Sequence, residues 1–186
     1  LEEACRVLTH SKKKGKKSVL IRSNLKKKYE IRSLIPRHIE RFPWSGHLGL
    51  TLLPEVLEEV EKANTTLLFT NVRSQAERWY HAILEAKPEL SVVLHHGSLD
   101  RKLREEAEEQ IKSGKAKLAV CTSSLDLGVD FPPVDLVIQV GSPKGIARML
   151  QRLGRSGHRP EETSRMLCVP TNSFELIEYS AARRAC

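Results

Sequence analysis

LAVCTSSLDLGVDFPPVDLVIQV, residues 118–140, contains two short apolar runs on either side of a polar loop. The runs at 118–121 and 136–140 have the length and composition of buried strands. Residues 145–153 follow as an amphipathic helix. The same alternation extends along the chain, with helices expected at 53–63, 74–86, 100–112 and from about 174, and strands at 66–70, 91–94 and 166–169. Apolar strands that alternate with helices predict an α/β fold, with a mostly parallel sheet in a three-layer αβα arrangement.

The helix expected at residues 145–153 has one apolar side. Helical spacing places four apolar side chains together: Ile146, Met149, Leu150 and Leu153. Three polar side chains lie off that face: Arg148, Gln151 and Arg152. This is the pattern of a helix that packs one side against a core.

The run QRLGRSGHR, residues 151–159, is the most distinctive in the chain. Gly154 offers a helix stop, so we expect Arg155 and Arg159 to project from a turn that glycine permits. Arginine side chains held on such a turn suit a phosphate group, because guanidinium donors match its oxygens and keep their charge. The alternative is a solvated basic helix end.

Two other helices have start signals in the sequence. Ser74, with Glu77 three residues later, predicts a capping box for the helix at 74–86. Ser98 or Asp100 is the expected cap of the helix at 100–112. The apolar faces of the two helices are Ala76, Trp79, Tyr80 and Ile83, and Leu103, Ala107 and Ile111.

The chain of 186 residues is 40% hydrophobic, which suffices for one well-buried domain. Its four cysteines form no CxxC pair and no His/Cys cluster, so they fit a reducing compartment such as the cytoplasm better than a disulfide or zinc framework. No apolar run approaches the roughly 18 residues that span a bilayer, and no signal peptide opens the chain, so we expect no membrane partner. The first residue is Leu1 rather than methionine, which indicates a piece of a longer protein.

The net charge of +8 is concentrated near the N-terminus. Residues 1–50 hold 13 Lys and Arg against 4 Asp and Glu, whereas residues 51–186 hold 18 against 19. The lysine clusters at 12–17 and 26–28 could bind phosphate backbones, or they could belong to a solvated linker and hairpin. The expected parts of the chain are a tail and basic linker at 1–17, a short β-hairpin (19–23 with 29–34) and loop at 18–50, and the main domain at 51–186.

Four polar segments follow expected strands: 71–73, 96–98, 122–130 and 141–144. In a parallel sheet the carboxyl ends of the strands lie at one edge, and ligands bind beyond that edge. The amide, hydroxyl and guanidinium groups of these segments, with glycine for close approach, suit the phosphates of a nucleic acid. Ordinary helix capping would explain some of the same residues.

Several kinds of chemistry are missing from the sequence. It has no GxxxxGK[ST] phosphate loop, no DExH or DExD tetrad and no Ser-His-Asp set. His95 and His96 are neighbours in an expected strand, so their side chains point to opposite faces and we expect no metal site. The chain cannot assemble a nucleotide hydrolysis site by itself.

Four segments in order resemble motifs of the second RecA-like domain of a superfamily 2 DExD/H-box helicase. They are LLFTNVR (motif IV), HHGSLDRKLREEAEEQIKSGK (the HG segment behind it), AVCTSSLDLGVD (motif V) and QRLGRSGHR (motif VI). The runs KKKYEIRSLIP and SSLDLGVDFPPVDLVIQVGSPKGIARMLQRLGRSGHR are most similar to the Lhr-type (large helicase-related) group, including its ligase-associated branch. LEEACRVL resembles the residues after motif III of the first RecA-like domain. The resemblance implies a RecA-like, P-loop NTPase-type fold that lacks its own P-loop.

This resemblance implies a site shared between two domains. A first RecA-like domain of the same polypeptide would bind ATP with Mg²⁺. The present domain would supply Arg155 and Arg159 as arginine fingers and Gln151 to position the attacking water. Gly128 would adjoin the nucleotide, and Asp130 would touch its ribose or fix an arginine. The residues implied to grip the nucleic-acid backbone are Asn71, Arg73, Gly97, Ser98, Thr122 and Ser123.

Two positions differ from the family pattern. His158 stands where motif VI usually has arginine, so the second finger is assigned to Arg159, since histidine is mostly neutral at neutral pH. Asp126 stands where Lhr-type proteins usually have glutamate, which keeps the acidity.

The implied function is one half of an ATP-dependent DNA helicase or translocase of DNA repair, moving 3′ to 5′ on single-stranded DNA or from a duplex end. The alternatives are the same domain acting on RNA, a non-enzymatic basic module that binds nucleic acid through residues 12–28, and an unrelated α/β nucleotide-binding enzyme. The last is disfavoured because the chain has no GxGxxG fingerprint.

Overall fold

The computed structural model describes residues 27–35, 49–126, 134–157 and 161–185. These residues form one six-stranded sheet with the strand order β1-β6-β5-β2-β4-β3. All its strand pairings are parallel. The strands are β1 Tyr29–Ser33, β2 Thr66–Phe69, β3 Val92–His95, β4 Leu118–Cys121, β5 Leu136–Val140 and β6 Ser164–Val169. The helices are α2 Leu53–Lys62, α3 Arg73–Ala86, α4 Arg101–Lys112, α5 Ile146–Leu153 and α6 Ser173–Ala185, with short 3-10 turns η1 Leu50–Leu52 and η2 Ser123–Leu125.

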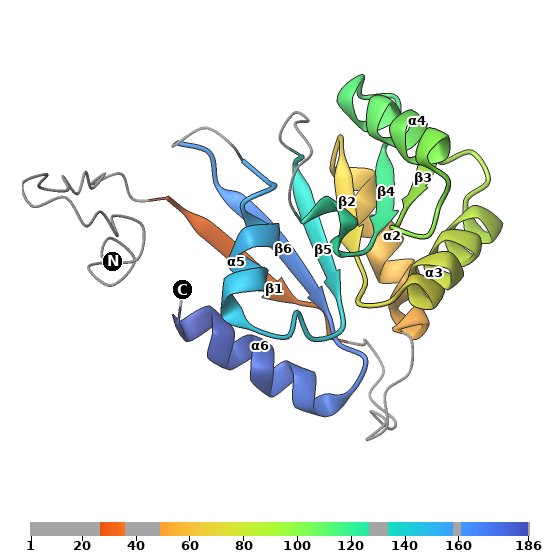
Figure 1. The fold of residues 1–186 in the computed structure, drawn as a ribbon. Helices are drawn as coiled ribbons and strands as arrows, with labels where there is room; N and C mark the ends of the chain where they lie inside the picture. The colour runs from red at the N-terminus through yellow and green to blue at the C-terminus, as the bar shows by residue number, and fades with distance from the viewer. Residues whose placement is uncertain (1–26, 36–48, 127–133, 158–160, 186) are drawn as a thin grey trace, which may run out of the picture.

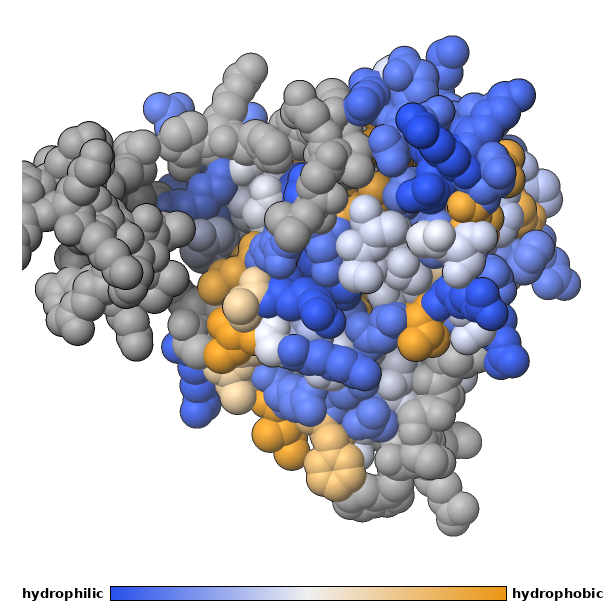
Figure 2. Space-filling view, in the orientation of Figure 1, coloured by the Kyte–Doolittle hydropathy of each residue, from blue (hydrophilic) through white to orange (hydrophobic). Residues whose placement is uncertain are grey.

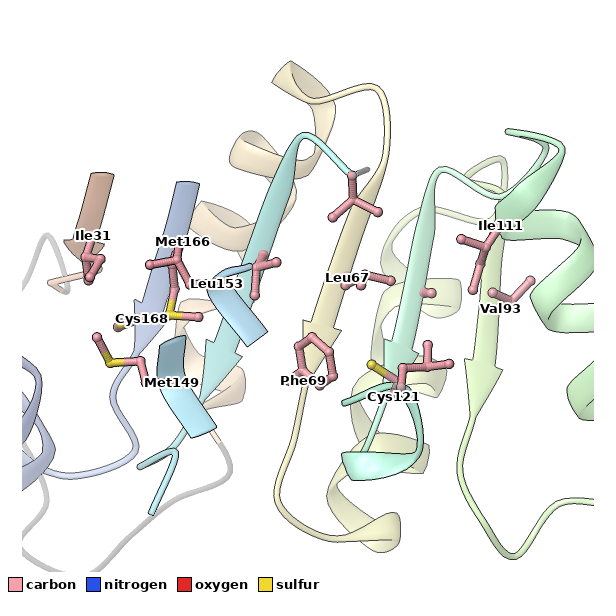
Figure 3. Packing of buried hydrophobic residues seen from close by; sticks show 14 of the residues in the cluster. Ile31, Leu67, Phe69, Val93, Ile111, Cys121, Met149, Leu153, Met166 and Cys168 are labelled. Atoms are coloured by element: carbon pink, nitrogen blue, oxygen red, sulfur yellow. The ribbon is translucent and has the colours of Figure 1, made fainter. Parts of the chain in front are cut away.

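The sheet is buried on both faces, which confirms the predicted three-layer α/β fold. Side chains alternate between the faces, so Leu67 and Phe69 of β2 belong to one apolar cluster and Leu68 to the other. The first cluster includes residues of α4, η2, α5 and α6, and the second includes residues of η1, α2 and α3. Figure 1 shows α5 and α6 in front of the sheet and α2 behind it. Figure 3 shows Leu67 and Phe69 on the side that also holds Met149 and Leu153 of α5.

Strand β1 is the second arm of the expected hairpin, and the structure places it in the main sheet. It pairs in parallel with β6, with Tyr29 opposite Ser164 and Ser33 opposite Cys168, and it forms one edge of the main sheet. Residues 29–33 therefore belong to the same sheet as the strands of the 51–186 region. The other expected arm, 19–23, lies outside the described residues, as do the basic clusters at 12–17 and at Lys26.

The start of α3 also differs from the prediction. The N-cap is Val72, no side chain caps it, and Ser74 lies inside the helix, so the capping box was wrong. The Gln75 side chain instead accepts a hydrogen bond from the backbone N–H of Asn71 at 3.3 Å. At α4 the prediction of Asp100 was right, because its carboxylate accepts from the Lys102 backbone N–H at 2.9 Å.

The surface seen in Figure 2 is largely hydrophilic, with small hydrophobic areas over α5 and α6. The exposed large hydrophobic residues of these two helices are Ile146, Phe174 and Ile177. Ile146 was expected on the buried face of its helix, but it lies at the first turn of α5 and is 42% exposed. Among the described residues, no helix has the length and apolar character needed to cross a bilayer.

Because the core has two sides, we expect alanine substitution to cost far more stability at a buried isoleucine than at an exposed one. Ile83 of α3 is fully buried, whereas Ile177 of α6 is 68% exposed. Ile83→Ala should lower the free energy of unfolding by about 2–5 kcal/mol, because it removes buried methyl groups and leaves a cavity. The matched change Ile177→Ala should shift it by less than about 0.5 kcal/mol. Urea unfolding of both variants measures this, and equal losses would contradict the assignment of the core.

Candidate functional site

The loops after four strands meet at the carboxyl edge of the sheet, as predicted. Backbone hydrogen bonds hold them side by side. The N–H of Thr70 donates to the Cys121 carbonyl at 2.8 Å, and that of Thr122 donates to the His95 carbonyl at 3.3 Å. On the other side of β2, the Asn71 side-chain amide donates to the Ser142 carbonyl at 2.8 Å. The polar segments that follow β2, β3, β4 and β5 therefore form one continuous edge.

Most of the residues predicted to grip nucleic acid lie open on this edge. Arg73, Gly97, Ser98 and Ser123 are exposed and Asn71 is partly exposed. The Arg73 guanidinium donates to the Ser98 hydroxyl at 3.3 Å, which joins the loops after β2 and β3. Thr122 is 9% exposed, so its side chain offers less surface than the sequence suggested.

Gln151 and Arg155 meet at a single atom. The Gln151 side-chain amide donates to the Asp126 backbone carbonyl at 3.1 Å, and Arg155 Nη2 donates to the same oxygen at 2.6 Å. Both side chains are partly buried. The first part of the run QRLGRSGHR, residues 151–155, is thus held against the loop after β4, and two of the predicted catalytic residues are neighbours in space.

Arg152 is the main correction to the sequence analysis. It was placed off the apolar face of α5, yet its side chain is 1% exposed. Its Nε and Nη2 donate to the two carboxylate oxygens of Asp126 at 2.7 and 3.3 Å, and Nη1 donates to Gln139 Oε1 at 2.6 Å. The guanidinium carbon lies 4.7 Å from the ring centroid of Phe69. Bidentate pairing and an aromatic face are the surroundings in which arginine tolerates burial.

The backbone just after α5 contacts the segment that leads into β5. The Val134 backbone N–H donates to the Arg155 carbonyl at 3.2 Å, and Val134 bridges Ser156 just before β5 begins. The Arg155 backbone is therefore near the amino edge of β5, and the nucleic-acid candidates are at the carboxyl edge. The loop after β4 reaches both parts of the site, since it carries Thr122 and Ser123 at the carboxyl edge and Asp126 beside Arg155.

The turn after α5 depends on a different glycine from the one expected. Gly154 does end the helix, but its φ of −65° is an ordinary helical value. The left-handed residue is Gly157, with φ of 59°, where an added Cβ would lie 3.0 Å from the Thr163 carbonyl oxygen. Gly128, Asp130, His158 and Arg159 were also named in the sequence analysis, and they lie outside the described residues.

His95 is a second residue whose setting the sequence did not reveal. Its Nδ1 lies 2.8 Å from the Ser124 hydroxyl and its Nε2 lies 3.0 Å from a Glu108 carboxylate oxygen. Burial lowers the pKa of His95 below its ordinary value, and it outweighs the opposing effect of Glu108; the charges of Arg104 and His96 lower the pKa further. The neutral ring can donate to Glu108 through Nε2, and the Ser124 hydroxyl donates to the His95 backbone carbonyl at 3.0 Å. His95 thereby ties α4 to the loop after β4.

No metal site is found within the described residues, where no three His, Cys, Asp or Glu side chains gather. Cys121 and Cys168 are buried free thiols. Burial raises the pKa of Cys168 to about 12 and raises that of Cys121 as well, so neither is a reactive thiolate.

Comparison with known proteins shows the family to which this domain belongs. The helicase conserved C-terminal domain family matches residues 49–159, more than half of the chain. The chain belongs to the helicase C-terminal domain family. This helicase domain is 37% identical over 164 residues to the ATP-dependent helicase Lhr-Core of Methanocaldococcus jannaschii, a match that covers 88% of the chain and 19% of that protein. The chain thus spans about a fifth of that relative's length.

Solved structures agree with this assignment. The domain superposes on the Mycobacterium smegmatis helicase Lhr, solved with single-stranded DNA and AMP-PNP, with a TM-score of 0.77 and 31% identity; the match covers 86% of this chain and 22% of that one. It also shares its fold with the C-terminal domain of the DEAD-box protein Dbp5, with a TM-score of 0.60 and 20% identity over 87% of this chain and 84% of that one. The predicted superfamily 2, Lhr-type, RecA-like domain is confirmed.

The lowered pKa of His95 predicts a pH dependence of the helicase domain's stability. In the fold the ring stays neutral below its ordinary pKa of about 6.5, whereas the unfolded chain takes up the proton there. Stability should therefore be lost as the pH falls below about 6.5. His95→Gln should show a smaller loss than wild type between about pH 7.5 and about pH 5.5 in urea unfolding. Exposed His81→Gln is the control, and an unchanged loss in the His95 variant would refute the assignment.

Proposed function

We propose that this domain is the ATPase-closing half of an ATP-dependent DNA helicase or translocase that acts in DNA repair. The observation that carries the proposal is the convergence of Gln151 and Arg155 on the Asp126 carbonyl at the end of α5. A guanidinium and an amide held side by side, each only partly buried, suit the phosphates of a nucleotide that lies outside the domain. The sequence contains no phosphate loop to bind a nucleotide of its own.

The chain's own residues fit the transition state of phosphoryl transfer. Arg155 would donate to the oxygens on which negative charge develops, with Arg159 as the second finger and Gln151 close to the attacking water. The buried pair of Arg152 and Asp126 holds the carbonyl to which Arg155 donates. ATP with Mg²⁺ would supply the reacting phosphate and its metal from the first RecA-like domain. Asp130 and Gly128 would adjoin the nucleotide.

The carboxyl edge of the sheet would hold the nucleic-acid strand. Arg73 offers a positive charge and Ser98 a hydroxyl, and their hydrogen bond places both at one point of the edge. Such side chains would contact phosphates and sugars, which are the same at every nucleotide, so binding would not depend on the base sequence. The other proposed contacts are Asn71, Gly97, Thr122 and Ser123. The Lhr structure with single-stranded DNA supports DNA as the substrate, and RNA remains the alternative.

Removal of the first arginine finger should abolish turnover. In the complete protein that carries this chain, Arg155→Ala should lower kcat for ATP hydrolysis by about 10³–10⁵-fold while nucleotide binding is mostly kept, because the finger acts on charge that develops in the transition state. Arg165→Ala, an exposed arginine of β6, is the matched control and should leave the rate unchanged. Steady-state ATPase assays and titration with a fluorescent nucleotide measure both quantities. Wild-type turnover of the Arg155 variant would refute the finger assignment.

The proposal also predicts where nucleic acid binds. Arg73→Ala should weaken single-stranded DNA binding and reduce the slope of log K against log salt by about 0.7–1, the contribution of one phosphate contact. Deletion of residues 1–17 should leave a measurable share of the affinity. If the chain were only a basic binding module, the deletion would remove nearly all affinity and Arg73→Ala would have no effect. Salt titrations of the two variants distinguish these functions.

A further inference from the structure

One buried amide stands between the two parts of the site. Gln139 lies in β5 and is fully buried. Its Oε1 accepts from Arg152 Nη1 at 2.6 Å, and its Nε2 donates to the carbonyls of Val140 at 3.0 Å and Gly141 at 2.9 Å. Only this orientation is possible, because the reversed amide would place its NH₂ against a guanidinium and its oxygen against two carbonyls. Glutamine is needed here since it donates and accepts at once.

The donor end of Gln139 holds the strand-end loop that begins at Gly141. The Gly141 carbonyl also accepts from the Tyr179 hydroxyl at 2.7 Å. The next residue, Ser142, accepts from the Asn71 side chain at 2.8 Å and donates its N–H to Glu175 at 2.9 Å. A force on Asn71, a proposed nucleic-acid contact, would therefore act on the first residues of this loop.

The acceptor end of Gln139 holds Arg152, whose remaining contacts lead to the proposed finger. Arg152 pairs with the Asp126 carboxylate, and the Asp126 carbonyl accepts from Arg155. Every polar link from Gly141 to Asp126 is buried. Water cannot replace a link that is stretched there, so a shift of the loop either moves Arg152 or leaves a buried group unpaired.

We propose that Gln139 is a positioning residue that couples the nucleic-acid edge to Arg155, so that a strand bound at Asn71 in the loop after β2 sets the finger for hydrolysis. This inference rests on the proposed function and adds to it the residue through which nucleic acid stimulates the ATPase. The element that would transmit the coupling is the loop that begins at Gly141, whose first residue has a left-handed φ of 72° and three separate anchors. Gln139 contacts neither ligand.

The test compares variants that cut the chain of contacts at one point. Gln139→Glu keeps the volume and the acceptor for Arg152 but turns an acceptor toward the two carbonyls, which breaks the link to the loop. Tyr179→Phe removes the second donor to the Gly141 carbonyl without touching Arg152. Thr66→Val is the control: it is a buried residue of the same sheet, at the other end of β2, whose hydroxyl has no hydrogen-bond partner in the described part of the chain.

The measured quantity is the ratio of kcat with saturating single-stranded DNA to kcat without it, in the complete protein. We expect Gln139→Glu to lower this ratio about tenfold, the rate equivalent of one buried hydrogen bond, with basal kcat, the KM for ATP and DNA affinity close to wild type. Tyr179→Phe should lower the ratio less, and Thr66→Val should not change it. Circular dichroism and unfolding midpoints establish that each variant is folded.

The outcomes separate this inference from the proposed function. An unchanged ratio in a folded Gln139→Glu protein, or an equal fall of basal and stimulated rates, overturns the inference while the Arg155 result still stands. If Gln139→Glu does not fold, Tyr179→Phe decides, and a wild-type ratio in that variant overturns the inference. A wild-type protein whose ATPase is not stimulated by DNA would overturn both proposals.

Discussion

The buried ion pair between Arg152 and Asp126 is the interaction on which the rest of the site depends. Taking two charges out of water costs several kcal/mol for each ion, and only good geometry with further hydrogen bonds offsets that cost. Here three contacts of Arg152 offset that cost: the bidentate contact with Asp126, the hydrogen bond to the Gln139 amide and the ring of Phe69. The pair fixes the loop after β4 against α5, and this brings the carbonyl of Asp126 to Gln151 and Arg155. A backbone hydrogen bond from the Asp126 N–H to the Ser123 carbonyl at 3.0 Å supports the same position of the loop.

The alternation of apolar strands and helices was enough to predict the layers of the fold, because burial on both faces dictates the composition of a parallel strand. The strand-end loops could be placed for the same reason. Arg152 could not, since helical periodicity marks the side of a helix that meets the sheet and says nothing of a neighbouring loop that covers another side. The loop with η2 does this to α5. Gln139 was overlooked because it lies within an otherwise apolar run, where one polar residue does not change the prediction of a strand.

The capping error at α3 and the misplaced glycine have a common physical origin. Local sequence signals describe what a residue can do, and several residues near a helix end can do the same thing. Gln75 took the role expected of Glu77, and Gly157 rather than Gly154 adopted the left-handed conformation. In both places the backbone path set by the strands decided between equal local candidates. The functional assignments that depend on side-chain type, such as the arginine of motif VI, are less sensitive to such exchanges.

Strand β1 has a consequence for how the chain is made. It lies at the edge of the sheet and pairs with β6, which follows it by most of the length of the chain. During synthesis β1 leaves the ribosome long before its partner exists, so the sheet closes last at this edge. Glu30 and Arg32 place charges on β1. Charged side chains on an edge strand hinder its pairing with other chains. The pairing of β1 with β6 joins residues far apart in the chain, and non-local contacts of this kind slow the folding of a domain.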